Sequence, residues 1–171
     1  MKKIIFAMIP ALIFMSCAGT ASVEVGLNDE GLTLGLYGDL KMRILEVELF
    51  DGETYQTLWE GSTPITVSVQ SADFVSISNG YEVVNPGSFT AARVTVDSLR
   101  YTDLSADIML ADAAIVFNAA AFTAIEIADG DEMNLVINVK SVNWFDMDSL
   151  KIISGKTPFE GAALKVYYPG T

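Results

Sequence analysis

Short segments in which apolar and polar residues alternate are the strongest constraint on what this chain can fold into. Leu45, Val47 and Leu49 alternate with two glutamates, and the segments 65–69 and 92–96 repeat the same period of two. Successive side chains of a β-strand point to opposite faces of a sheet, so this period predicts strands with one buried face. No segment shows a convincing helical period, and we therefore predict an all-β protein.

Turn-forming residues separate these strands and predict how they connect. Asp51-Gly52-Glu53-Thr54 predicts a hairpin that places Trp59 late on the returning strand. Asn79-Gly80 predicts a second hairpin, between 74–78 and 81–84, because both residues adopt positive φ easily. These turns favour antiparallel pairing of strands that are neighbours in the sequence.

The second half of the chain continues the pattern. The acidic loop 129–132 predicts a turn across which strands 122–127 and 135–139 pair. The alanine-rich stretch 111–121 suits a helix by its composition, but its β-branched and aromatic residues also suit short strands. We favour strands there and leave the helix as the alternative.

Closely spaced strands without helices are typical of an antiparallel β-sandwich, and this is the fold that we predict, with about nine strands. The first strand is expected at 32–36 and the last at 164–168. Pro64 is expected at the entrance of strand 65–69, since proline is rarely found in the middle of a sheet.

The N-terminal segment predicts export and lipid attachment. Lys2 and Lys3 precede an apolar run over 4–15, which is too short to span a bilayer, for which about 20 residues are needed. The run ends at Ser16-Cys17, and this end resembles the lipobox of bacterial lipoproteins, whose cysteine is lipidated and becomes the first residue after cleavage. The alternative is an ordinary secretory signal in which the cysteine has no role.

These signals divide the chain into three predicted parts. Residues 1–16 form a lipoprotein signal peptide, 17–31 hold the lipidated cysteine and a small, polar tether, and 32–171 form the β-sandwich domain. The membrane is then a partner through the lipid on Cys17. Ala18 stands where some lipoproteins carry the aspartate that retains them at the inner membrane. By that resemblance we expect the outer membrane of a cell with two membranes.

Several features occur in an order that carries a family resemblance. They are a strand pair at 32–36 and 40–50, Leu58-Trp59 ahead of strand 65–69, a proline-glycine turn into the aromatic-led strand 86–96, and the late segment 122–139. This order resembles the family of bacterial and archaeal lipoproteins catalogued as DUF4382, a domain of unknown function, over about residues 30–155. The resemblance implies a surface-anchored, transthyretin-like or immunoglobulin-like β-sandwich with no established reaction.

Charge and residue types argue against several classes of function. Removal of the signal with its two lysines changes the formal net charge from −12 to −14. Such an acidic domain does not suit nucleic acids, whose phosphates are bound by clustered basic residues. The chain has no histidine, so it lacks the usual general base and zinc ligand. A lipidated Cys17 leaves no free thiol. We therefore expect no catalysis, no cofactor and no nucleic acid partner.

One acidic loop is a candidate metal site. Asp129, Asp131 and Glu132 surround a glycine and offer the oxygen ligands that calcium prefers. A tight hairpin turn with solvated acids accounts for the same residues, and no complete ligand set is visible in the sequence.

A second acidic loop and one tryptophan are candidate ligand-binding residues. Asp146 and Asp148 follow Trp144-Phe145, and carboxylates beside an aromatic ring suit a sugar ligand. Trp59 is a further aromatic candidate. The alternative for Trp144 and its neighbour is that they fill one end of the core, since large aromatic side chains are usually buried.

The function that we expect is a non-enzymatic binding or scaffold domain, anchored by lipid to the cell envelope. A carbohydrate-binding module is one alternative, using Trp59, Trp144 or a tyrosine, with a glycan as its partner. A hydrolase is a second alternative and requires two carboxylates that face each other across a cleft. A third is an assembly component that lends an edge strand to another envelope protein.

Overall fold

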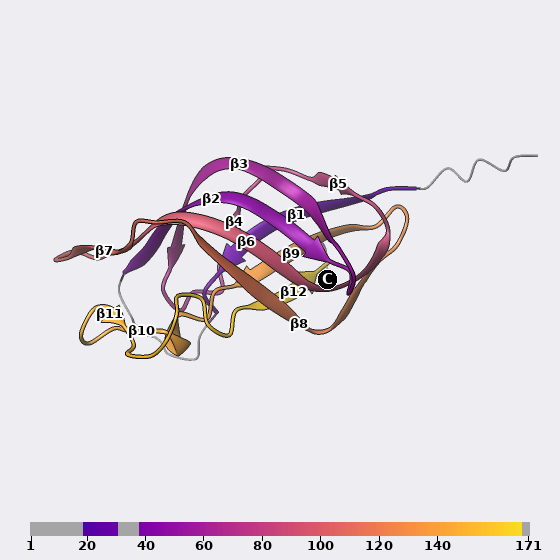
Figure 1. Ribbon diagram of the computed structural model, residues 1–171. Helices are drawn as coiled ribbons and strands as arrows, with labels where there is room; N and C mark the ends of the chain where they lie inside the picture. The colour runs from indigo at the N-terminus through magenta and orange to yellow at the C-terminus, as the bar shows by residue number, and fades with distance from the viewer. Residues whose placement is uncertain (1–18, 31–37, 169–171) are drawn as a thin grey trace, which may run out of the picture.

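The structure is a computed structural model, and it describes residues 19–30 and 38–168 (Figure 1). The predicted strand at 32–36 and the signal with Cys17 lie outside the described residues. The elements are β1 (Ala21–Asn28), β2 (Asp39–Phe50), β3 (Tyr55–Ser68), β4 (Val75–Ser76), β5 (Glu82–Val84), β6 (Gly87–Thr102), β7 (Asp107–Ala111), β8 (Ile115–Ile127), β9 (Glu132–Asn138), the 3-10 helix η1 (Ser141–Asn143), β10 (Phe145–Asp146), β11 (Lys151–Ile152) and β12 (Ala163–Tyr167). Within these ranges there is no α-helix, so the predicted all-β class is confirmed, and 111–121 contains strands.

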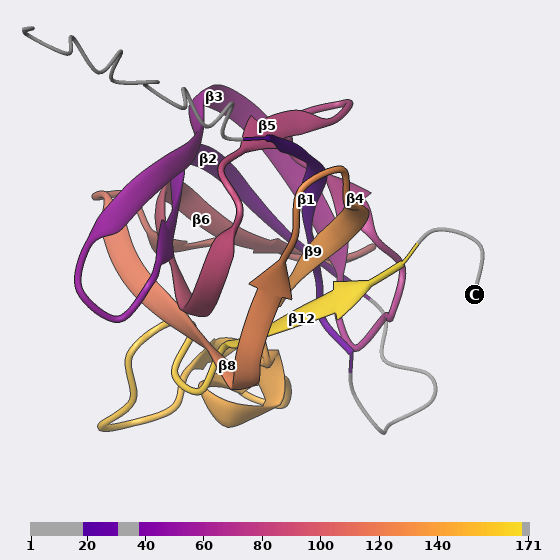
Figure 2. The ribbon, with the colours of Figure 1, turned by 90° about the vertical axis from the view of Figure 1, so that its right-hand side faces the viewer.

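One large sheet forms the body of the molecule. Its strand order is β3-β2-β6-β8-β12-β9-β1-β4, with β5 paired to β1 and β7 paired to β6. The sheet curls until it is nearly closed into a barrel-like shape, which Figure 2 shows along its length. Because the sheet curls, one face of each long strand points into a shared core and the other points to solvent.

Two strand pairings in this sheet are parallel, so the sheet is mixed and not antiparallel throughout as predicted. β1 and β9 run side by side over seven register pairs, from Ser22 with Glu132 to Asn28 with Asn138. β8 and β12 are also parallel, at Ala120 and Ala121. Turn signals in a sequence predict antiparallel neighbours, whereas a parallel pair requires a long connection that no local pattern reveals.

The alternation seen in the sequence produces the core. On β1 the inward side chains Val23, Val25 and Leu27 are buried, and the inward residues of β2, β6 and β9 meet them. Trp144 and Phe159 fill the end of the core near η1, with their ring centroids 5.2 Å apart. Each large apolar side chain that is fully buried contributes about 1.5–3 kcal/mol to stability.

The first predicted hairpin is present, but its strands are longer than expected. β2 and β3 pair from Phe50 with Tyr55 to Asp39 with Ser68, and Asp51 holds the turn by accepting hydrogen bonds from the N–H groups of Glu53 and Thr54. The hydrogen bonds to these two backbone groups lower the pKa of the Asp51 carboxyl.

Pro64 lies inside β3 and not at the entrance of a new strand as predicted. It pairs with Arg43 of β2. β3 is the first strand in the sheet order and has β2 as its hydrogen-bonded neighbour. A proline in such an edge position leaves the ladder intact when its nitrogen faces away from the neighbouring strand.

The predicted hairpin at Asn79-Gly80 is wrong. The segments on either side of it, β4 and β5, do not pair with each other, because both pair with β1: β4 at Gly26 and Leu27, and β5 at residues 21–23. Asn79 does adopt a positive φ of 55°. Here the turn residues make an outward excursion within one interrupted strand that runs antiparallel to β1.

The predicted pairing of 122–127 with 135–139 is also wrong. β8 and β9 follow each other in the sequence, but β12 lies between them in the sheet and pairs with both (Figure 2). The turn between β8 and β9 is tight, since the N–H of Asp131 donates to the Ala128 carbonyl, but its flanking strands do not pair with each other. Its contacts instead run to the start of β1, where Gly130 donates to the Thr20 carbonyl and Ser22 donates to the Asp131 carbonyl.

β8 bends sharply in its middle. On β6, Phe89 pairs with Ile125 and Ala91 pairs with Ala120, so residues 121–124 of β8 lie opposite a single residue of β6. Phe122 lies in this bulge and is fully exposed. Bulges bend strands and increase their local twist, and this one marks the place where β8 and β12 stop pairing.

The predicted tether over 17–31 is wrong for residues 21–28. These residues form β1, which has partners on both sides and four buried apolar side chains. Its glycine and serine suggested a linker, but Gly26 and Ser22 lie on the outer face of the strand. The folded part therefore includes residues 21–28 and does not begin at 32.

Candidate functional site

A pocket lies on the outer face of the strands β1, β9 and β12, and we call it the outer pocket. Its volume is about 200 Å³, and it is lined by Asn28, Ala72, Phe74, Asn134, Val136 and Tyr167. The lining comes from three strands and from the segment between β3 and β4. These parts of the chain are far apart in sequence, and the parallel pairing of β1 with β9 brings them together.

The aromatic wall of the outer pocket rests on a glycine. Gly26 of β1 pairs with Val136 of β9. A β-carbon at Gly26 would lie 2.5 Å from Cε2 of Phe74 and 2.5 Å from the Val75 carbonyl oxygen. Only glycine therefore allows the Phe74 ring to lie against the sheet, where it forms one wall of the pocket.

The wall that carries Phe74 is held by a buried carboxylate. Asp29, at the end of β1, is 1% exposed. Its oxygens accept hydrogen bonds from the N–H of Gln70 at 2.7 Å, from the N–H of Ser141 at 2.8 Å and from the Ser141 hydroxyl. Asp29 therefore ties the segment that follows β3 to β1 and to η1.

Two asparagines lie toward the two ends of the pocket floor. In the parallel register Asn28 pairs with Asn138, and Asn134 lies four residues earlier on β9. Four residues of strand extend about 13 Å. Asn28 and Asn134 are therefore offset by roughly that distance along the strands, with Val136 between them.

Both asparagines have an amide oxygen without a partner. Asn28 is 2% exposed, and its Nδ2 donates to the Ala72 carbonyl at 3.3 Å. Its Oδ1, like Oδ1 of Asn134, is buried and accepts no hydrogen bond from any described residue. An unmade hydrogen bond at a buried polar atom costs about 1–3 kcal/mol. Two of the residues that line the outer pocket thus carry a buried acceptor for which the described chain supplies no donor.

The side of the pocket toward β12 is formed by a tyrosine. Tyr167 pairs with Asn134 in the antiparallel β12–β9 ladder and is 47% exposed. With Phe74, it provides aromatic rings at two sides of a hollow that is open to solvent. Preformed hollows with apolar walls and a few polar groups are the usual form of a small-molecule site.

None of the described residues that line the outer pocket carries a charge. The nearest ion pair is the one between Lys165 and Glu30, since Lys165 pairs with Val136 on the sheet. Glu30 also accepts a hydrogen bond from Nδ2 of Asn138 at 3.3 Å. The lysine is thus held by Glu30 and lies outside the lining.

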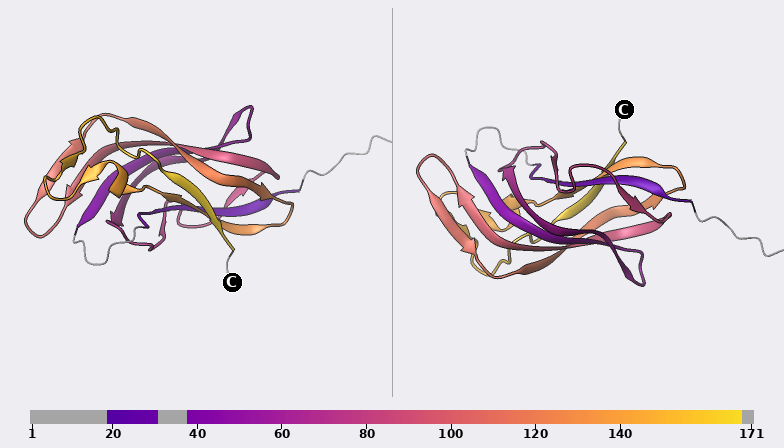
Figure 3. Two further views of the ribbon diagram at one scale, coloured as in Figure 1. Left: turned by 90° about the horizontal axis from the view of Figure 1, so that it is seen from below. Right: turned by 90° about the horizontal axis from the view of Figure 1, so that it is seen from above.

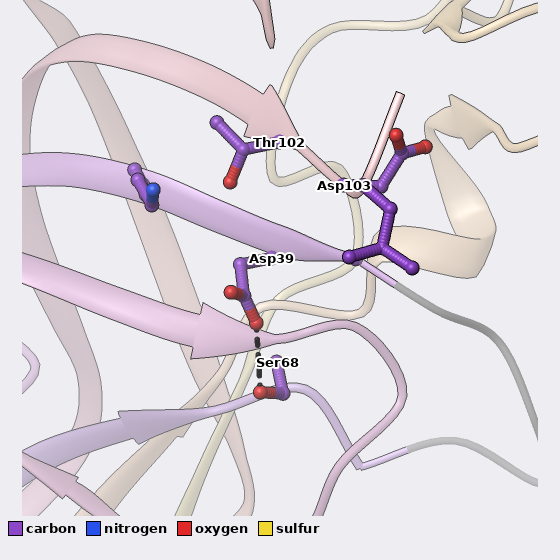
Figure 4. A pocket seen from close by; sticks show the side chains of 7 residues that line it. Asp39, Ser68, Thr102 and Asp103 are labelled. Carbon is purple, nitrogen blue, oxygen red and sulfur yellow. Dashed lines mark hydrogen bonds between the residues drawn. The ribbon is translucent and has the colours of Figure 1, made fainter. Parts of the chain in front are cut away.

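A larger, more polar pocket lies at the end of the sheet where β2 begins and β3 and β6 end (Figure 4). Its acids already have partners. Asp39 accepts a hydrogen bond from the Ser68 hydroxyl at 2.8 Å. Asp103 accepts bonds from the N–H groups of Ser105 and Ala106, and from the Tyr101 hydroxyl at 3.0 Å. Figure 4 shows the two carboxylates turned away from each other.

The tryptophans do not form an exposed platform. Trp144 is 0% exposed, and its Nε1 donates to the Val139 carbonyl at 2.9 Å, so its ring is part of the core. Phe145 is buried beside it. Trp59 is half-buried on β3 and packs against the core.

The structure brings Asp146 and Asp148 together in a shallow hollow of about 460 Å³ near η1, which also contains Gln70 and Val142. Asp146 accepts hydrogen bonds from the Ser149 hydroxyl at 2.7 Å and from the N–H of Asp148 at 3.0 Å. These bonds lower the pKa of the Asp146 carboxyl. Among the described residues of this hollow, no exposed aromatic ring accompanies the two acids.

The other acidic loop lies at the opposite end of β9. Asp131 accepts a hydrogen bond from the N–H of Ala128 at 2.7 Å and so closes the turn between β8 and β9. Figure 1 shows this turn at one end of the molecule and the β10–β11 pair at the other. The hydrolase alternative would require acids that face each other. The acids of these two loops do not. Among residues 19–30 and 38–168 no group of three or more acidic or cysteine side chains is placed to hold a metal ion.

Comparison with protein-family models, with curated proteins and with solved structures finds no match for this chain. In the described part of the chain, no helix has the length and apolar character needed to cross a membrane.

Sequence reasoning missed the outer pocket entirely. Its asparagines lie in strands, where an asparagine is uncommon, and this is the one signal that marked them. Phe74 and Tyr167 fall in predicted strands, and the carbohydrate-binding alternative includes a tyrosine without specifying which one. Because the register between β1 and β9 depends on a long-range parallel pairing, the sequence pattern did not place the two asparagines on one face.

Proposed function

We propose that this protein is an exported, lipid-anchored binding protein whose folded domain holds a small ligand in the outer pocket without chemical conversion. The observation that carries the binding function is the pair of unpartnered amide oxygens, on Asn28 and Asn134, beside the aromatic walls of a preformed pocket. A ligand with hydrogen-bond donors would remove the cost of leaving both oxygens unpaired.

The anchor is proposed from the sequence alone. The basic start, the short apolar run and Ser16-Cys17 support export and lipidation at Cys17. Two or more acyl chains provide stable membrane attachment, since each buried methylene contributes about 0.8 kcal/mol. Ala18 supports the outer membrane of a two-membrane cell, and membership of the DUF4382 family is part of the same proposal.

The anchor is tested by Cys17→Ser. We expect this variant to lose the acyl mass and to leave the membrane fraction, with the folded domain unchanged by circular dichroism, because β1 begins after the cysteine. Persistent acylation of the variant, measured by mass spectrometry of the intact protein, would show that Cys17 is not the lipidated residue.

Binding is tested by nuclear magnetic resonance of the isotope-labelled full-length chain in detergent micelles. Mixtures of saccharides, capped peptides and small amines are added in turn, and the side-chain amide signals of Asn28 and Asn134 are followed. We expect at least one class to shift these two signals more than the amide signal of Asn118, which lies on the outer face of β8. Absence of any such shift in all three classes would overturn the binding function.

A further inference from the structure

We propose that the ligand of the outer pocket is a neutral saccharide, bound with one sugar ring against the pocket floor between Asn28 and Asn134. This inference rests on the binding function proposed above and names the chemical class that the pocket selects. Three properties of the lining lead to it: its unpaired acceptors, its lack of charge and its shape.

The hydrogen-bonding groups of the pocket require a ligand that donates. The two unpaired atoms are both amide oxygens, which accept hydrogen bonds and never donate them. Asn28 already gives an amide hydrogen to the Ala72 carbonyl, and this bond fixes the amide with its oxygen as the free group. Hydroxyl groups meet this demand, because each can rotate to point its hydrogen at the acceptor.

An extended peptide is a poorer source of hydrogen-bond donors for the two amide oxygens. Every peptide unit brings one carbonyl acceptor with each N–H donor, and the carbonyl would need a donor in turn. Because the fixed Asn28 amide presents its oxygen, such a carbonyl near Asn28 would be left unpaired. A saccharide avoids this conflict, since each of its hydroxyl groups serves as donor or acceptor.

The lack of charge in the pocket argues for a neutral ligand. The six lining residues include no acid and no base, and a charged ligand that enters an apolar hollow without an opposite charge loses much of its hydration free energy. The nearby lysine is paired with Glu30, so it offers no free charge to an anion. Neutral hydroxyl groups avoid both costs.

The shape of the pocket suits a flat ring. Val136 forms the floor, Phe74 lies on the side of Gly26 and Tyr167 on the side of β12. A sugar ring presents polarised C–H groups on its faces, and these pack against aromatic rings. The volume of about 200 Å³ is below the range of about 300–1,000 Å³ that is typical of drug-sized ligands. One ring is therefore enclosed, and further rings of a chain extend past the half-exposed Tyr167 into solvent.

The experiment is isothermal titration calorimetry of the full-length protein in a detergent without a sugar headgroup. The saccharide probes are cellobiose, maltose and N,N′-diacetylchitobiose, and the comparison probes are a capped alanine tripeptide and n-butylamine. We expect at least one saccharide to bind and neither comparison probe to bind.

Variants then locate the binding. Asn134→Leu removes the acceptor and Tyr167→Ala removes the ring, and each is expected to weaken saccharide binding by about tenfold or more. Asn134→Asp keeps two acceptor oxygens at the same place, so it is expected to retain binding. Asn118→Ala and Asp148→Ala are matched controls outside the outer pocket and are expected to bind as the natural protein does. Thermal unfolding of each variant checks that it is folded.

The possible failures are distinct. Binding of the peptide or the amine at Asn134 and Tyr167, with no saccharide bound, would overturn the saccharide class and leave the binding function intact. Binding of a saccharide that is lost in Asp148→Ala and kept in Asn134→Leu would place the saccharide in the hollow near η1 and overturn the assignment. Failure of every probe to bind would count against the binding function itself.

Discussion

Tyr101 shows at the scale of one residue how burial changes the pKa of a side chain. Its side chain is 1% exposed at the end of β6, and its hydroxyl donates to Asp103. Burial first, and then this hydrogen bond, raise the pKa of Tyr101 to about 12, against about 10 in an unfolded chain. The folded state therefore holds this proton more tightly than the unfolded state does.

A pH dependence follows from Tyr101. Its contribution to the free energy of unfolding is complete below pH 10 and is lost as the pH rises from about 10 toward 12, because the unfolded chain ionises first. Tyr101→Phe keeps the ring in the core and removes the ionising group. We expect the difference in stability between natural protein and variant, measured by urea unfolding, to shrink from pH 9 to pH 11.5. A constant difference over that range would contradict the assignment.

The residues of the outer pocket show why sequence reasoning stopped short of the site. Asn28 and Asn134 are uncommon residue types for a strand, but nothing in their sequence neighbours marks an unpaired oxygen. An unpaired atom is defined by what is absent around it in three dimensions, so only the packed structure reveals it. Trp144 shows the opposite case, since its size alone favoured the core position that it occupies.

At the scale of elements, a local turn signal predicted a pairing correctly only where no distant strand competed for the same partner. The turn at 51–54 predicted the β2–β3 hairpin because the residues that pair are close in sequence. The turn residues Asn79-Gly80 and the loop 129–132 are equally strong local signals. Their flanking strands pair elsewhere, with β1 and with β12, because burial of apolar faces in the curled sheet outweighs the local preference.

The position of a strand in the sheet also predicts how it tolerates proline. The N–H of Ser22 donates to the Asp131 carbonyl on the β9 side, and alternate residues of a strand point their N–H groups the same way. Glu24→Pro therefore removes a hydrogen bond between β1 and β9, and we expect a loss of about 1–3 kcal/mol or more in the free energy of unfolding.

Two controls isolate this effect of proline. Glu24→Ala removes the same side chain and keeps the N–H, so it should cost much less. Thr66→Pro lies two residues beyond the natural Pro64 on the edge strand β3, with its N–H on the same side, and should also cost little. Urea unfolding of the three variants makes the comparison, and equal losses for Glu24→Pro and Glu24→Ala would refute it.

At the scale of the whole molecule, the all-β class could be predicted because the alternation of apolar residues runs through most of the chain. The curled, mixed sheet could not be predicted, since closure depends on which distant strands meet. Figure 3 shows from two further sides how β1 runs along the sheet to its far end. Its small residues resembled a tether in the sequence, although the inward residues of β1 are as apolar as those of any core strand.

The whole-molecule prediction is that a chain beginning at residue 32 does not fold. Such a chain lacks β1, which holds β9 on one side and both β4 and β5 on the other. We expect it to show no cooperative thermal transition by circular dichroism, whereas a chain that begins at Ala18 shows one. A folded product from the shorter chain would restore the tether interpretation of residues 21–28.

The place of β1 in the sheet also has a consequence in time. Ser22 and Glu132 are register partners, yet they are separated by 110 residues of chain. At a synthesis rate of roughly 5–20 residues per second, β9 appears roughly 5–20 s after β1. During that interval the edge of β1 that pairs with β9 is unpaired, and the apolar side chains of β1 lack the β9 part of the core. A chaperone that keeps this nascent chain from aggregating should therefore act on its first strand and release it late.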